Sequence, residues 1–122
     1  MVKGKFGNLL KKIIAGKIGI MDFRFSVIAG NWAAAEWRTK ILSDSVAEFS
    51  VYPSSSPKYQ RELAIDGELA KEHKIIVRGL KPDTIYYFKI SSTDKFGNRE
   101  QSPEMSFKTA EAEKEEKAKI IV

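Results

Sequence analysis

The sequence contains no cysteine and only one histidine, His73, among its 122 residues. The missing thiols exclude a disulfide framework, a cysteine-rich zinc site and a thiol nucleophile. A single histidine excludes the paired-imidazole metal motifs. No motif joins His73 to a serine nucleophile, so we interpret it as a polar residue at the edge of a strand. The sequence therefore predicts no enzyme activity, no bound metal and no cofactor.

Long apolar runs are missing as well. Lys11, Lys12 and Lys17 divide the apolar residues of the first 20 positions into short pieces. A secretory signal needs an unbroken apolar run of roughly 7 to 15 residues, and a membrane span needs about 20. We therefore expect neither a signal peptide nor a transmembrane segment, and we expect Met1 to belong to the mature protein. A membrane-associated and a complex-bound location both fit this expectation.

Acidic residues are absent from residues 1–20, which in effect carry all of the net charge. That segment has a charge of +5, whereas residues 21–109 carry +1 and residues 110–122 carry −1. Residues 21–109 are thus nearly neutral, which argues against a nucleic-acid-binding face on this part of the chain. The first 20 residues also lack the arginines and interleaved aromatic residues that base stacking uses. We thus expect no nucleic-acid partner.

Residues 1–20 have helical hydrophobic spacing. Six apolar residues fall at i, i+3, i+4, i+7, i+8 and i+12, with lysines beside or opposite them, which predicts an amphipathic helix. Such a helix is marginal alone, because ordering each residue costs about 1 to 2 kcal/mol. It needs a surface to lie on, and three remain open: its own domain, another protein subunit or an anionic membrane. The predicted contact residues are Lys5, Phe6, Leu9, Leu10, Lys11, Lys12, Ile13, Ile14, Lys17 and Ile18.

The middle of the chain alternates between apolar and polar residues with the period of a β-strand. The residues expected to face inward are Phe23, Phe25, Val27, Ile75, Val77, Tyr86, Phe88 and Ile90. Several such strands at short spacing predict an all-β sandwich of two antiparallel sheets with about seven strands. A sandwich of this kind needs roughly 100 residues. We therefore expect one domain over residues 21–109, flanked by the segment 1–20 and a charged tail at 110–122, with no clear strand pattern in residues 53–71.

Leu80, Pro82, Thr84 and Tyr86 follow one another at intervals of two residues between two of the expected strands. This pattern resembles the corner of a fibronectin type III domain, and the similarity extends over residues 22–109. The resemblance implies a binding or structural module without chemistry of its own. It also implies structural roles in the core for Trp37, Leu80, Pro82 and Tyr86. The hydroxyl of Tyr86 is then expected to bond back to the backbone a few residues upstream.

Trp37 continues an inward row formed by Ala33 and Ala35, which resembles the second strand of that family with its core tryptophan. Residues 43–49 look like its third strand. Trp32 has the opposite parity, so we expect it to point outward. There it is either a contact residue or a side chain covered by a neighbouring loop.

The tail contains two i, i+4 pairs in the favourable order, Glu113 with Lys117 and Glu115 with Lys119. They are typical of a short solvated helix, although a frayed charged terminus is the interpretation that we favour.

These features together predict a non-catalytic accessory or scaffolding subunit. It is expected to act in protein–protein interaction within a multi-subunit complex, docking on a larger assembly through its N-terminal helix. The alternative is a peripheral membrane protein anchored by the same cationic helix.

Overall fold

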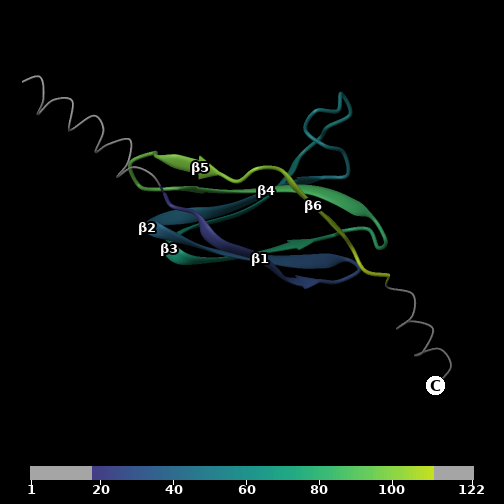
Figure 1. Cartoon of the computed structure of the whole chain (residues 1–122), viewed down its shortest axis with the longest axis horizontal. Coiled ribbons are helices and arrows are strands. Elements are labelled where there is room, and N and C mark those ends of the chain that lie inside the picture. Colours follow the sequence, from purple (N-terminus) through teal and green to yellow (C-terminus); the bar gives the residue numbers. More distant parts are fainter. Residues whose placement is uncertain (1–17, 112–122) are drawn as a thin grey trace, which may run out of the picture.

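The computed structural model describes residues 18–111 and shows an all-β sandwich in that part of the chain, with no helix among these residues (Figure 1). All strand pairs are antiparallel. The strands are β1 (Met21–Ile28), β2 (Trp32–Ser50), β3 (Glu62–Arg78), β4 (Ile85–Thr93), β5 (Arg99–Gln101) and β6 (Met105–Lys108).

Two long strands, β2 and β3, pair along most of their length and run through both layers of the sandwich (Figure 1). The first half of β2 lies between β1 and the second half of β3. Its second half lies between the first half of β3 and β4, which in turn pairs with β5 and β6. The register between β2 and β3 shifts between Arg38 and Ser43, where the ribbon bends from one layer to the other.

Residues 18–111 therefore contain six separate strands instead of about seven. The second and third strands expected from the sequence form the single strand β2. Residues 53–71 have no clear strand pattern in the sequence, yet β3 begins within them, at Glu62. The first half of β3 pairs with β2 and exposes Leu63 and Ile65. The small Ala64 packs against the core instead, so hydrophobicity gives no inward alternation here.

The core contains most of the side chains that the alternation places inward. Ile75 and Val77 on β3 and the apolar row of β4 are buried, which confirms the alternation for these two strands. The expectation for Val27 is wrong, because its side chain is 38% exposed. A register shift between Phe25 and Val27 reverses the alternation at that point, as a β-bulge does. Trp32 is half-buried at the start of β2.

The corner between β3 and β4 is built around Tyr86. Its ring is buried, and its hydroxyl oxygen accepts a hydrogen bond of 2.8 Å from the backbone N–H of Lys81. Leu80 is also buried, whereas Pro82 is exposed. Pro82 therefore belongs to the turn and not to the core, because the backbone next to it turns outward with Asp83 at a φ of 51°. The Tyr86 hydroxyl thus satisfies one backbone donor of the corner, and the buried hydroxyl of Thr109 bonds to the Lys81 carbonyl and the Thr84 N–H beside it.

We expect Tyr86→Phe to lower the free energy of unfolding by about 1 to 3 kcal/mol, because the N–H of Lys81 loses its acceptor. Tyr87→Phe is the matched control, since Tyr87 is only partly buried and accepts no backbone bond among the described residues. Chemical denaturation of both variants measures the difference. Equal midpoints for the two variants would show that the hydroxyl does not hold the corner.

Candidate functional site

One end of the sandwich gathers four segments that are far apart in the sequence, and we call it the N-terminal pole (Figure 1). It consists of residues 18–20, the bends of β2 at 39–43 and of β3 at 67–71, and the turn at 94–98. The described part of the chain ends at the opposite end of the sandwich, after β6.

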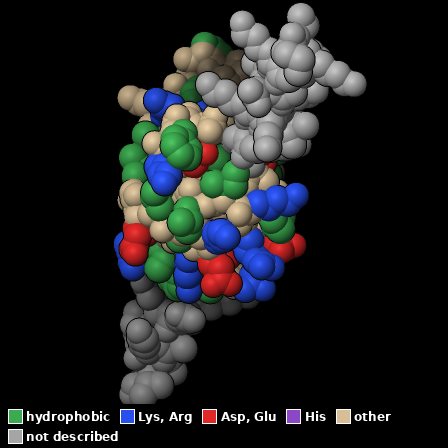
Figure 2. Space-filling model, turned by 90° about the vertical axis from the view of Figure 1, so that its left-hand side faces the viewer, with side chains coloured by type: hydrophobic (Ala, Val, Ile, Leu, Met, Phe, Trp, Pro, Cys, Tyr) green, Lys and Arg blue, Asp and Glu red, His purple; other side chains and the backbone are tan. Residues whose placement is uncertain are grey.

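Three apolar side chains, which we call the apolar tip, protrude at this pole. Leu42 is 52% exposed, Leu69 40% and Phe96 79%. They line an open hollow of about 340 Å³ together with Ile41. Figure 2 looks onto this end of the molecule and shows hydrophobic side chains among both basic and acidic side chains. Exposed apolar side chains gathered in one place are typical of an interaction surface.

Three lysines surround the apolar tip, and we call them the lysine rim: Lys40, Lys71 and Lys95. None of them forms an ion pair with another residue in the stretch 18–111. The ammonium group of Lys95 lies 5.1 Å from the centre of the Phe96 ring. The hollow therefore combines apolar side chains with three lysines and the carboxylate of Asp94.

The turn that presents Phe96 is held by the carboxylate of Asp94. One oxygen accepts hydrogen bonds of 2.9 Å from the backbone N–H groups of Phe96 and Asn98. The other accepts one of 3.0 Å from the Asn98 side-chain amide, which is the main cause that lowers the pKa of Asp94. Gly97 supplies the positive φ of 87° that the turn needs. Phe96 is thus exposed on an ordered turn.

The chain enters the pole through residues 18–20, which are clamped by distant residues. The carbonyl of Ile18 accepts a 2.9 Å bond from the N–H of Lys40. The carboxylate of Glu100 accepts bonds of 3.1 Å from the N–H groups of both Gly19 and Ile20. Gly19 has a φ of 72°, and a Cβ there would lie 2.8 Å from the Lys40 side chain. Only glycine fits this position without displacing Lys40.

Ile18 is the one predicted contact residue that lies among the described residues. It was expected on the apolar stripe of an N-terminal helix, and its side chain is fully buried, at 0% exposure. The other nine predicted contact residues lie outside the described residues: Lys5, Phe6, Leu9, Leu10, Lys11, Lys12, Ile13, Ile14 and Lys17.

Beneath the pole, His73 lies in the interior and not at a strand edge, so the expectation from the sequence is wrong. Its ring is 4% exposed, since it sits in the middle of β3 on the inward face. One ring nitrogen is 2.8 Å from the Thr39 hydroxyl and the other is 2.7 Å from the Ser45 hydroxyl. The ring also stacks on Trp37, with centroids 5.1 Å apart. Burial lowers the pKa of His73 and keeps the imidazole neutral.

We expect the stability of the protein to fall as the pH is lowered from 7.5 to 5. Below about pH 6.5 the unfolded chain binds a proton at its histidine, whereas the lowered pKa of His73 keeps the folded chain unprotonated. The stabilisation is therefore complete above this pH and is lost as the pH falls through the folded pKa. The free energy of unfolding should change by at most about 1.4 kcal/mol per pH unit, which is the limit for the uptake of one proton.

Denaturation curves at several pH values, recorded for the native chain and for His73→Gln, test this expectation. His73 is the only histidine, so the variant should be less stable at pH 7.5 but insensitive to pH in this window. An equal pH dependence in both proteins would assign the effect to other groups.

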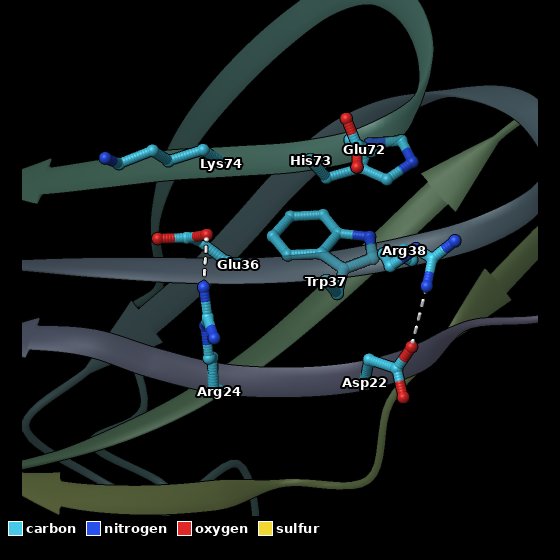
Figure 3. A pocket seen from close by; sticks show the side chains of 8 residues that line it. All are labelled: Asp22, Arg24, Glu36, Trp37, Arg38, Glu72, His73 and Lys74. Atoms are coloured by element: carbon cyan, nitrogen blue, oxygen red, sulfur yellow. Dashed lines mark hydrogen bonds and ion pairs between the residues drawn. The ribbon is translucent and has the colours of Figure 1, made fainter.

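A second hollow, of about 480 Å³, lies on the outer face of the layer formed by β1, β2 and β3 (Figure 3). Charges of alternating sign cross the strands there in two rows, Arg24–Glu36–Lys74 and Asp22–Arg38–Glu72. Arg24 and Glu36 are 3.1 Å apart, and Arg38 and Asp22 are 3.4 Å apart. Because each charge has an opposite neighbour, the rows favour the correct strand register. They leave little net charge for a ligand.

One buried carboxylate, Glu48, lies on β2 and is also satisfied within the sandwich. It accepts a hydrogen bond from the hydroxyl of Tyr59 and pairs with Arg61 at 3.3 Å. The pKa of Tyr59 is raised to about 12, mainly by burial and next by the hydrogen bond to Glu48. No group of three or more histidine, aspartate or glutamate side chains within residues 18–111 is arranged to hold a metal ion. The same residues contain no helix of sufficient length and hydrophobicity to cross a membrane.

The residues of the apolar tip were not identified from the sequence. Leu42 falls between two segments expected to be separate strands, and Leu69 lies where no strand was expected. Phe96 carried the one usable signal, since a large aromatic residue stands in a turn beside Gly97 and Asn98. Nothing local in the sequence shows that these three residues meet.

Comparison with known proteins finds no matching family model and no curated protein of similar sequence. Solved structures do match. A myokine structure has a TM-score of 0.63 at 12% identity, covering 76% of this chain and 97% of its own. A fibronectin type III domain derived from the human KIAA0970 protein has a TM-score of 0.60 at 15% identity, covering 86% and 82%. The fibronectin type III domain of human fibronectin type III domain containing protein 3 has a TM-score of 0.56 at 16% identity, covering 76% and 85%. At these identities the likeness concerns the fold.

Proposed function

We propose that this chain, which has the fold of a fibronectin type III domain, is a non-catalytic interaction module that attaches to a larger assembly through its N-terminal pole. The observation that carries this proposal is the apolar tip, where three partly or largely exposed apolar side chains meet. The stripe of residues 1–17 joins the sandwich at the same pole, because Ile18 is bonded to Lys40. The apolar tip and the point where residues 1–17 join the sandwich therefore share one end of the molecule.

The polar interior supports a module without chemistry of its own. In the part of the chain that the structure describes, no buried side-chain nitrogen or oxygen lacks a hydrogen-bond partner. His73 and Glu48, the two groups most suited to proton transfer, are both buried and already bonded to neighbouring side chains. A general base needs a free position within reach of a substrate proton. Neither group offers one.

The N-terminal stripe supports attachment because its apolar residues need a surface. A protein partner would bind mainly through the apolar side chains, so Leu10→Asp or Ile14→Asp would abolish association. Lys11→Gln together with Lys12→Gln would weaken it only modestly, since exposed ion pairs each contribute little. In this form the chain is an accessory or scaffolding subunit. A membrane is the alternative surface, for which the lysines would matter more.

Photo-cross-linking in the cells that produce the protein tests the proposed orientation. A benzophenone-bearing phenylalanine analogue at position 96 is a conservative replacement at the tip, and the same analogue at Ile85 is the control. Ile85 is 51% exposed and begins β4 at the opposite end. We expect cross-links to protein or lipid from position 96 and few from position 85, in proteins of unchanged stability.

Equal yields from both positions, or cross-links from position 85 alone, would contradict attachment through the N-terminal pole. A cross-linked product from position 96 that contains one main partner would identify what the module binds.

A further inference from the structure

We propose that the N-terminal pole binds the anionic interface of a lipid bilayer. The inference rests on the proposed attachment through the N-terminal pole and takes the alternative surface, a membrane, as the partner. It is carried by the juxtaposition of the apolar tip, the lysine rim and the entry point of residues 1–17 at one end of the sandwich.

The apolar tip has the form of an insertion element. Leu42, Leu69 and Phe96 come from three separate segments, and Phe96 extends furthest into solvent at 79% exposure. Hydrogen bonds to the Asp94 carboxylate hold the turn, so Phe96 stays exposed on an ordered backbone. A bilayer interface accepts aromatic and leucine side chains at the boundary between headgroups and acyl chains. Insertion into a bilayer does not require a groove that matches the shape of the apolar tip.

The lysine rim supplies the complementary charge. Lys40, Lys71 and Lys95 have long apolar stems, which let their ammonium groups reach lipid phosphates while the tip inserts beside them. Such lysines each strengthen binding to an anionic leaflet, and salt screens the effect. Two nearby carboxylates keep their negative charge, but their oxygens are bonded to backbone N–H groups, Asp94 to its own turn and Glu100 to residues 19 and 20.

Two exposed acidic residues do oppose this surface, Asp66 and Glu68, which flank Gly67. Glu68 is exposed and precedes Leu69 in the bend of β3. Its carboxylate would face the headgroups if the tip inserts. Glu68→Lys is therefore a gain-of-function variant that the proposal predicts.

The sequence of residues 1–17 supplies a second candidate element. They contain five lysines, no acid and an apolar stripe, and they join the sandwich where Ile18 meets Lys40. A single interfacial element gives marginal membrane binding, whereas two that act together give stable attachment. A flat bilayer can contact both elements at once. A short acidic peptide seated in the hollow of about 340 Å³ would contact the tip alone.

Co-sedimentation of the full chain with vesicles tests the inference. The vesicles are phosphatidylcholine with or without phosphatidylserine, each at low and high salt. We expect pelleting only with phosphatidylserine, with loss at high salt. Replacing the three rim lysines by glutamine should weaken binding on the order of 100-fold. Phe96→Ser should weaken it roughly tenfold, and Glu68→Lys should strengthen it several-fold.

Matched controls use the opposite end of the sandwich. Ile85→Ser and the triple replacement of Lys58, Lys81 and Lys108 by glutamine remove the same groups from exposed positions there. Both should bind as the native chain does. Unchanged unfolding midpoints in all variants would show that the fold is intact.

Absence of pelleting of the native chain with phosphatidylserine at low salt would overturn the inference. Pelleting that is insensitive to Phe96→Ser and to loss of the rim lysines would also overturn it, because residues 1–17 alone would then bind the membrane. A protein cross-linked through position 96 without vesicle binding would leave the proposed function standing and exclude the membrane as partner. Cross-linking from position 85 alone, with no vesicle binding, would contradict both the proposed function and the membrane inference.

Discussion

The indole of Trp37 is the contact on which both layers of the sandwich depend. It lies on β2, its ring stacks on His73 of β3, and its N–H donates a 2.9 Å hydrogen bond to the hydroxyl of Ser92 on β4. Trp37 is 1% exposed and Ser92 is fully buried, so this bond is shielded from water. Because β2 and β3 each run through both layers, one fixed side chain near their bend sets the position of both halves. A buried bond of this kind also makes other registers unfavourable, since a slip would leave the indole N–H unpaired.

The sequence predicts the fold where local alternation and tertiary environment agree. Ile75 and Val77 face the core because one side of the second half of β3 is covered and the other is open. The first half of the same strand gives no such pattern, since it exposes Leu63 and Ile65 and packs only the small Ala64 against the core. The corner at Tyr86 was predictable because its turn chemistry is contained within a few residues. The burial of Ile18 was not, because the clamp on the residues after it comes from Glu100, about 80 positions away.

The polar residues near the bend show a related limit. Thr39, Ser43 and Ser45 have the composition of a turn or loop, yet all three are buried beneath the pole. They are tolerated there because each hydroxyl has a partner in His73, in another hydroxyl or in the carbonyl of Ile41. Satisfied hydroxyls carry little of the cost that unpaired polar groups would. The local sequence around each of these residues does not indicate which partner its hydroxyl will have.

The pole is therefore stabilised by a different interaction from the centre of the sandwich. At the centre, aromatic and aliphatic side chains pack together. At the pole, two carboxylates hold the backbone, Glu100 at the chain entry and Asp94 in the turn. Rigidity obtained through such hydrogen bonds does not require the nearby apolar side chains to be buried, so Leu42 and Phe96 remain exposed on ordered backbone. The charged rows on the outer sheet face are neutralised within the sandwich, whereas the tip and its lysines are not. This asymmetry is the physical reason for placing the proposed binding surface at the pole.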